Sequence, residues 1–438
     1  MEIKQEKRSN LLSKIGEICF RIGMLLLASA FFYSSILLLI SFIIASLKSK
    51  NILRDKWNFP LIICSFLMII VCLISNFNPS TYLNFKTDNN LNWIGLLNWI
   101  PMFWVYWSSQ YYLKTVEERI NCAFYLVLGT VPVLISGFCQ YYLNWYGPFK
   151  FLNETIIWYQ REIQYQVFTG PFNNPNYAGS WVTTIFPLSL FFLLKKTRLK
   201  FNKIFYSFSS FGIILAIFLT NSRNAIINLT IAFTLLIGLS IKTLFLIYLI
   251  FIAFISLILI FKIPIGSIAF LSENIIIRSF MPDKNNFHDI FSFPRIRIWK
   301  TTFSNIFSNP FVGWGASSFS LLYFLKNGEP TFQHTHNLIL EMANNYGVII
   351  CLILFINIFL LMYKSKPILS KKEIYNLNNQ LINKFWWVST LIILMMHFTD
   401  ITYYDGRISL LFWILIAGLR SILREKNNAL RIESSILN

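Results

Sequence analysis

Long apolar stretches, separated by short polar segments, follow one another along almost the whole chain. They recur from near residue 15 to near residue 420, and each comes close to the roughly 20 residues that a helix needs to cross a bilayer. The pattern predicts an all-α polytopic membrane protein with about 12 transmembrane helices. The expected spans are roughly 15–30, 32–47, 59–76, 91–112, 120–143, 176–194, 204–221, 224–240, 243–262, 341–363, 385–399 and 408–420. It divides the chain into an N-terminal membrane bundle of about nine spans (1–262), one large loop with short helices (263–340) and a C-terminal part with the last spans and a tail (341–438).

Composition excludes an ordinary soluble domain. Of 438 residues, 55% are hydrophobic and only 13% are charged, against about 25% charged in typical globular proteins. The net charge of +19 could indicate nucleic-acid binding, but the basic residues lie in short clusters between the apolar stretches, as they do in membrane proteins. We therefore expect a lipid bilayer, and no nucleic acid, as partner.

The lysines and arginines predict the orientation of the spans. Four basic residues precede the first apolar segment, 15–47, and four follow it: Lys4, Lys7, Arg8, Lys14, Lys48, Lys50, Arg54 and Lys56. A single crossing would put one cluster outside, so two short spans are predicted there, 15–30 and 32–47. Continuing the alternation puts both termini in the cytoplasm and the large loop on the opposite side.

The large loop ends in a histidine motif. Gln333-His334-Thr335-His336-Asn337 opens a helical segment. A His-x-His pair could bind metal, but carboxylates in this loop are few and scattered, so no metal is expected. The positive end of a helix keeps an imidazole neutral, which suits a general base. His336 is the candidate base and Asn337 a cap or an orienting partner, while a purely structural histidine is the alternative.

Two arginines are the candidate anion-binding residues. Arg223 follows Asn221-Ser222 at a tight outer turn, where an Asn or Ser can cap the following helix. A cation at that helix start opposes the helix dipole and calls for an anionic partner. A structural salt bridge or interfacial snorkelling is the alternative. In the loop, Arg295 lies four residues before Trp299, on the predicted apolar face with Phe303, Ile306 and Phe307. Arg295 is therefore expected to point inward, and Arg297 to meet solvent.

Two further outer segments carry unusual polar residues. Between the last two spans, Asp400 lies near the membrane edge, where an ionised group is costly and so suggests function. Asp405-Gly406 is a turn, and pairing of Asp405 with Arg407 is the simple alternative to a binding role for Arg407. The stretch from Gly170 to Gly179 contains Asn174-Pro175-Asn176, which is typical of a turn and a helix cap, with carbohydrate contact as the alternative.

These motifs, taken in order, resemble the O-antigen ligase and O-antigen polymerase superfamily. The resemblance rests on Phe172-Asn173-Asn174-Pro175-Asn176, Ser222-Arg223, Arg295-x-x-x-Trp299, Pro310-x-x-Gly313-x-Gly315 and, above all, His336-Asn337 with Gly347 after nine further residues. The ending Asp400…Tyr404-Asp405-x-Arg407 is similar to cyanobacterial-type members. After Gly347 the chain continues Val348-Ile349-Ile350-Cys351, unlike the longer ligase motif, so ligase and polymerase both stay open.

The resemblance implies a metal-independent, inverting membrane glycosyltransferase with a GT-C-like fold in the bacterial inner membrane. Its substrate would be an undecaprenyl-diphosphate-linked glycan, and its acceptor a hydroxyl of lipid A core, of a protein or of another glycan, at the periplasmic face. By the same resemblance His336 would be the base, Arg223 and Arg295 would hold the diphosphate, and His334 and Asn337 would support them. Asp400 and Arg407 complete the candidate substrate-binding residues.

Two other classes of protein remain possible. A transporter is one, since some cyanobacterial relatives carry names of bicarbonate-transport proteins. A transporter should place its charges near mid-membrane, whereas here the polar residues gather at the outer edge. A non-catalytic scaffold for envelope assembly is the other, and it would leave Arg223 and His336 dispensable.

Overall fold

The computed structural model describes residues 2–49, 55–77, 81–82, 85–86, 89–163, 166–195, 200–238, 294–328, 332–367 and 377–437. In this part of the chain the helices are α1 (Glu2–Leu26), α2 (Phe31–Lys48), α3 (Phe59–Phe77), α4 (Asn89–Leu96), α5 (Ile100–Ser109), the 3-10 helix η1 (Gln110–Tyr112), α6 (Val116–Leu143), α7 (Pro175–Leu194), α8 (Lys200–Leu219), α9 (Arg223–Ile237), α13 (Pro294–Ser308), α14 (Ser318–Asn327), α15 (Leu338–Tyr346), α16 (Val348–Ser365), α17 (Leu377–Met396) and α18 (Gly406–Leu437). Two small antiparallel hairpins accompany them, β1 (Thr81–Tyr82) with β2 (Phe85–Lys86) and β3 (Phe149–Phe151) with β4 (Ile156–Trp158).

The expected all-α membrane protein is confirmed in outline. Six described helices are long and apolar enough to cross a bilayer: α2, α3, α6, α7, α16 and the segment Gly406–Asn428 of α18. Two shorter apolar segments, Lys203–Leu219 and Arg223–Ile237, make up most of α8 and the whole of α9. The total of about 12 spans stays a prediction, as do the GT-C-like architecture and the three-part division. The expected span 243–262 and most of the loop before Pro294 lie outside the described residues.

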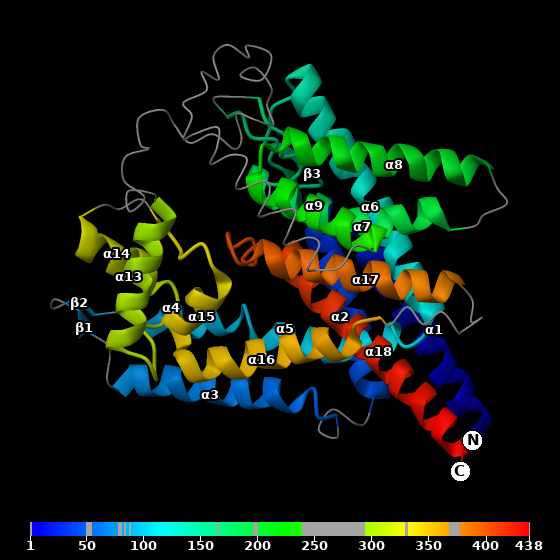
Figure 1. The fold of residues 1–438 in the computed structure, drawn as a ribbon, viewed down its shortest axis with the longest axis horizontal. Helices are drawn as coiled ribbons and strands as arrows, with labels where there is room; N and C mark the ends of the chain where they lie inside the picture. Colours follow the sequence, from blue (N-terminus) through cyan, green and yellow to red (C-terminus); the bar gives the residue numbers. More distant parts are fainter. Residues whose placement is uncertain are drawn as a thin grey trace.

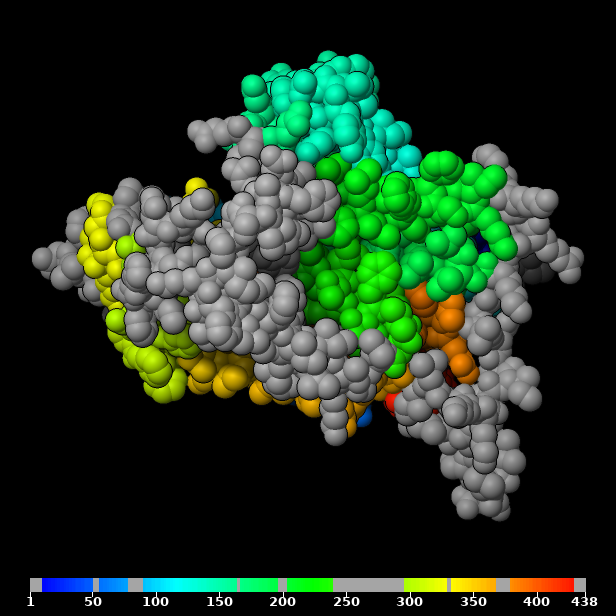
Figure 2. All heavy atoms as spheres, turned by 45° about the horizontal axis from the view of Figure 1, so that its top comes forward, coloured from blue at the N-terminus to red at the C-terminus, as the bar shows by residue number. Residues whose placement is uncertain are grey.

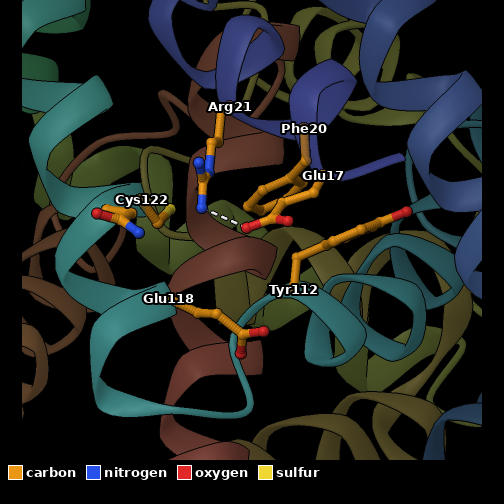
Figure 3. A pocket seen from close by; sticks show the side chains of 7 residues that line it. Glu17, Phe20, Arg21, Tyr112, Glu118 and Cys122 are labelled. Atoms are coloured by element: carbon orange, nitrogen blue, oxygen red, sulfur yellow. Dashed lines mark hydrogen bonds and ion pairs between the residues drawn. The ribbon is translucent and has the colours of Figure 1, made fainter. Parts of the chain in front are cut away.

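The predicted helical pair at the N-terminus is present. α1 and α2 fold back on each other and pack along their lengths. Arg21, a basic residue within the first apolar stretch, pairs with Glu17 one turn earlier. Figure 3 shows this ion pair beside Phe20, Tyr112 and Cys122 in a small pocket between α1, η1 and α6. The pairing allows a charged side chain to be accommodated in an otherwise apolar helix.

Two segments predicted as continuous spans are broken. The segment 91–112 divides into α4, α5 and η1, and Pro101 lies in the first turn of α5, where its missing N–H is tolerated. The segment 341–363 divides into α15 and α16 at Gly347, whose φ is +87°. Hydropathy does not reveal either break, because it is insensitive to the backbone dihedral angles at which a helix ends.

Different helices and chain ends lie at the two opposite ends of the molecule's long axis. Figure 1 shows both chain ends at the right, together with the C-terminal end of α7 and the N-terminal ends of α8 and α17. α13, α14 and α15 lie at the left, at the opposite end. α18 runs through the middle and is the most buried candidate span. Figure 2 shows α8 and α9 beside α17, which packs on α7 and α9.

Candidate functional site

Two segments far apart in sequence meet at the end of the molecule that carries α13 to α15. We call residues 332–337, before α15, the histidine loop, and residues 397–405, between α17 and α18, the outer turn. Nδ1 of His336 lies 2.9 Å from Oδ1 of Asp400. The Asp400 carboxylate is 7% exposed and the imidazole 25% exposed, so the imidazole is the more accessible member of the pair.

Hydrogen bonds to two backbone carbonyls of the outer turn connect it to the histidine loop. The Leu338 N–H donates to the His397 carbonyl at 2.9 Å, and the Asn337 side-chain amide donates to the Phe398 carbonyl at 2.9 Å. The Asn337 side-chain oxygen accepts from the N–H groups of Ile339 and Leu340. Asn337 therefore caps α15, as predicted, and joins the helix start to the outer turn.

Thr335, the residue before His336, is held from both sides. The indole N–H of Trp299 in α13 donates to the Thr335 carbonyl at 3.1 Å. The Thr335 N–H donates to the buried Glu341 carboxylate at 3.0 Å. His336 itself has a φ of +52°, a left-handed conformation that is uncommon outside glycine. Such a conformation persists only where the surroundings impose it, and these two hydrogen bonds are part of that constraint.

The charge states in the site follow from burial and from the neighbours. Burial pushes the pKa of Asp400 up, but the hydrogen bond to His336, the two imidazoles and the Ile401 N–H outweigh it and hold the pKa below its usual value. An ionised carboxylate only accepts hydrogen bonds, so Nδ1 of a neutral His336 is the protonated nitrogen. Nε2 is then left with its lone pair, which is the arrangement that a general base requires.

His334 completes a cluster of possible metal ligands. Its ring centroid lies 4.3 Å from that of His336, and its Nδ1 accepts the His336 N–H at 3.3 Å. Burial, and then the nearby His336, lower the pKa of His334 to about 4. One ligand atom from each of His334, His336 and Asp400 lies within 4.8 Å of the others. The carboxylate missing from the loop sequence is thus supplied by the outer turn.

The outer turn also receives the start of α9, where Arg223 is the first helical residue. Ser222 caps this helix by accepting the Ala225 N–H, so that part of the cap prediction is confirmed. The Asn224 side chain donates to the Met396 carbonyl at 2.9 Å, next to the outer turn. Arg223 is exposed, and among the described residues it has no hydrogen-bond or ion-pair partner. The salt-bridge alternative therefore finds no support there.

The predicted orientation of the arginines in α13 is wrong. Arg295 is exposed, whereas Arg297 is half-buried and engaged in a contact. Two members of the apolar stripe taken as the inner face, Phe303 and Phe307, are instead exposed. The buried face of α13 is formed by Ile298, Thr302, Asn305 and Ile306. Arg295 still lies one turn before Trp299, which contacts the histidine loop, and it has no partner among the described residues.

Arg407 is engaged inside the protein. Its guanidinium pairs with Asp405, donates to the Pro171 carbonyl at 3.1 Å and lies 3.9 Å above the Phe172 ring. The pairing alternative is confirmed, and the contacts favour a structural role for Arg407. They fasten the segment before α7 to the outer turn. Asn174 caps α7 by accepting the Asn176 N–H at 2.8 Å, as predicted.

Two of the glycine motifs form one structural unit behind the site. A Cβ on Gly347 would lie 2.2 Å from the Phe311 carbonyl oxygen, and one on Gly313 would lie 2.7 Å from the Asn345 backbone. Between them, the Trp314 N–H donates to the Asn344 carbonyl at 2.8 Å and the Val348 N–H donates to the Pro310 carbonyl at 2.8 Å. The turn after α13 therefore packs against the end of α15, the helix that begins at the histidine loop.

Several contributing residues were not predicted. Glu341 accepts from Thr335, from the Asn345 amide at 3.3 Å and from the Tyr404 hydroxyl at 3.5 Å. A carboxylate one turn after a helix cap was the available signal, but the sequence does not show which loop it holds. Asp400 was expected to bind substrate, and its contact with His336 could not be read from the sequence either.

Comparisons with known proteins address the family. The family model described as O-antigen ligase matches residues 208–356 of this chain. That segment contains Arg223, Arg295, His336 and Gly347 and ends before the outer turn. A comparison with curated protein sequences gives no match. The members of the matched family are enzymes of the ligase and polymerase type that act in glycosyl transfer. The match agrees with the motifs, and over this segment the chain is similar to the O-antigen ligase family.

Proposed function

We propose that this protein is a membrane glycosyltransferase that joins an undecaprenyl-diphosphate-linked glycan to an acceptor hydroxyl. The observation that carries the proposal is the His336–Asp400 pair, on a loop that hydrogen bonds connect to α13 and, through the outer turn, to the start of α9. Each of these two helices presents an exposed arginine in its first turn. A base on a loop connected to two helices that each begin with an exposed arginine suits the transfer of a sugar away from a diphosphate.

In the proposed reaction Nε2 of His336 takes the proton of the acceptor hydroxyl. The acceptor oxygen forms a bond to the anomeric carbon, while the bond from that carbon to the diphosphate breaks and its electron pair leaves with the lipid diphosphate. Attack opposite the leaving group inverts the anomeric carbon. Asp400 stabilises the imidazolium and keeps Nε2 available, a role that lies behind the base rather than on the substrate.

Arg223 and Arg295 are the proposed ligands of the diphosphate. A guanidinium with no internal partner can donate two parallel hydrogen bonds to a phosphate. Both residues lie in the first turn of a helix, where backbone N–H groups add positive potential. Their charge would stabilise the leaving group as the bond breaks. The proposed transfer therefore needs no metal ion.

The proposed location of the chemistry is the periplasmic face of the inner membrane. The basic clusters around residues 1–14, 48–56 and 420–431 assign their end of the molecule to the cytoplasm. The chain ends lie at the end opposite to α13, α14 and α15 (Figure 1). This separation supports cytoplasmic termini and a periplasmic histidine loop. Fusions of alkaline phosphatase after Phe332 and after Asn428 should be active and inactive, respectively.

The acceptor decides between ligase and polymerase. A ligase transfers the glycan to lipid A core or to a protein, and a polymerase transfers it to another carrier-linked repeat. A surface-polysaccharide gel of a deletion strain separates them. Loss of attached long chains with accumulation of carrier-linked polymer indicates a ligase, and products with a single repeat indicate a polymerase. A defect only at low inorganic carbon would instead support transport.

Variants of two residues test the chemistry itself. His336→Ala and Arg223→Ala should each abolish transfer while the protein remains folded and inserted. Lys150→Ala, which removes an exposed charge from the hairpin β3–β4, is the matched control and should complement the deletion. Normal glycan length and attachment with both active-site variants would contradict the proposal and favour the scaffold.

A further inference from the structure

We propose that His334, His336 and Asp400 bind a transition-metal ion of the Zn²⁺ type, and that the bound ion inhibits transfer. The three candidate ligand atoms lie within 4.8 Å of one another, and two of them, on His336 and Asp400, are 2.9 Å apart. Ligands about 2.1 Å from a tetrahedral ion lie about 3.4 Å from each other. The 2.9 Å between His336 and Asp400 and the 4.8 Å limit for all three atoms lie on either side of that value.

The kind of ligand selects the kind of ion. Two imidazoles with one carboxylate suit Zn²⁺, which commonly binds three protein ligands and keeps a fourth position for water. Mg²⁺ and Ca²⁺ prefer oxygen ligands, and Fe²⁺ and Mn²⁺ bind nitrogen-containing sites less tightly than Zn²⁺. This set of ligands therefore favours Zn²⁺, and Mg²⁺ serves as the negative control.

The inhibitory part of the inference rests on the proposed function. A metal ion bound at Nδ1 of His336 would take the place of the proton that Nδ1 donates to Asp400, and that proton would move to Nε2. Nε2 would then have no lone pair for the acceptor proton, and the ion would also draw on the negative charge of Asp400. Zn²⁺ should therefore lower the transfer rate, and a chelator should restore it. A catalytic metal would have the opposite signature, since removal of the ion would then stop the reaction.

Binding is measured on the full-length protein in nanodiscs, independently of transfer. After EDTA treatment and gel filtration, Zn²⁺ is titrated against a chromophoric chelator, with Mg²⁺ in parallel. One Zn²⁺ site is expected in the wild type. His334→Gln and Asp400→Asn should weaken it more than about tenfold, since changes behind a metal ligand alone cost 10–100-fold. Gln333→Ala, an exposed neighbour in the histidine loop, should bind as the wild type does.

Each outcome supports or contradicts the inference. The absence of Zn²⁺ binding by the wild type, or equal binding by His334→Gln, would overturn the site. Loss of transfer after EDTA treatment would overturn the inhibitory role in favour of a catalytic metal. If a variant misfolds, the wild type still decides, because Zn²⁺ and not Mg²⁺ must raise its melting temperature. A wild type that binds Zn²⁺ but transfers no glycan refutes the proposed function and keeps the metal site.

Discussion

His336 donates from Nδ1 to the carboxylate of Asp400 across 2.9 Å, although 64 residues separate the two in sequence. The first belongs to a loop before α15 and the second to the turn between α17 and α18. Asp400 is also held by the Ile401 N–H at 2.9 Å, so the carboxylate is fixed in position. The proposed base and its partner therefore form one unit.

Asp400→Asn should lower kcat by about 10²–10⁴-fold, the range of general acid–base catalysis. Asparagine keeps the size of the side chain but cannot stabilise the imidazolium that forms as the proton is taken. The measurement is transfer by purified protein from a lipid-diphosphate donor. Because both residues act through the same step, a double variant with His336→Ala should be no slower than His336→Ala alone. Additive losses would separate the two residues.

Glu341→Gln should lower kcat with little change in KM, because Glu341 is a positioning residue. The Glu341 carboxylate accepts the Thr335 N–H on one oxygen and the Asn345 amide and Tyr404 hydroxyl on the other. Glutamine replaces one of these acceptors with an NH₂ group, so at least one donor loses its partner, at a cost of about 1–3 kcal/mol. Glu154→Gln, on the exposed hairpin β3–β4, is the control. A change in KM alone would contradict positioning.

Gly347→Ala should strongly destabilise the protein. The new Cβ would meet the Phe311 carbonyl oxygen at 2.2 Å, and φ is +87°. Gly238→Ala is the matched control, since Gly238 has a φ of +92° and a Cβ there meets no described atom within 4 Å. The control carries only the cost of the left-handed backbone, about 1–2 kcal/mol. Melting temperatures in detergent compare the two, and equal losses would show that the close approach to Phe311 is unimportant.

The sequence predicted the features that depend on local pattern. Capping positions at Asn174, Ser222 and Asn337 were recognisable because each needs only one side chain and the next turn. The orientation of the spans, inferred from the charge alternation, stays a prediction. The resemblance to the O-antigen ligase family, which the family model also finds over residues 208–356, followed from motifs in a fixed order. The contacts between these motifs could not be predicted, since they depend on which helix ends lie together in space.

Two errors have definite physical causes. The apolar stripe of α13 was assumed to face inward, but in a protein that contacts lipid an exposed stripe can be as apolar as a buried one. Arg295 and Arg297 were exchanged for that reason. The break at Gly347 was missed because hydropathy is insensitive to φ, and only the approach of the Phe311 carbonyl makes the glycine necessary.

The half-buried His334 should make the protein less stable in acid. Its pKa falls from 6.5 to about 4 on folding, so below pH 6.5 the unfolded chain binds a proton that the folded protein does not. Stability is therefore lost as pH falls from about 6.5 to about 4, and levels off below that for this group. Asp400 contributes only at lower pH, because its pKa is held below 3.8. Melting temperatures between pH 7 and 4 should decline less in His334→Gln, and an unchanged slope would contradict this assignment.

Substitutions of the two exposed arginines should distinguish diphosphate binding from a structural role. Arg223 and Arg295 have no partners among the described residues, so their replacement should leave the melting temperature nearly unchanged. Arg223→Lys and Arg295→Lys keep the charge but lose the paired donors, and should retain more activity than the alanine variants. Transfer from a lipid-diphosphate donor should fall mainly in kcat, because the charge on the leaving group is largest in the transition state.

Arg407→Lys is the contrasting case. It breaks the contacts with Asp405 and Pro171 and should lower the melting temperature. A loss of stability in the Arg223 or Arg295 variants as large as that of Arg407→Lys would mean that these residues support the fold and do not bind the donor.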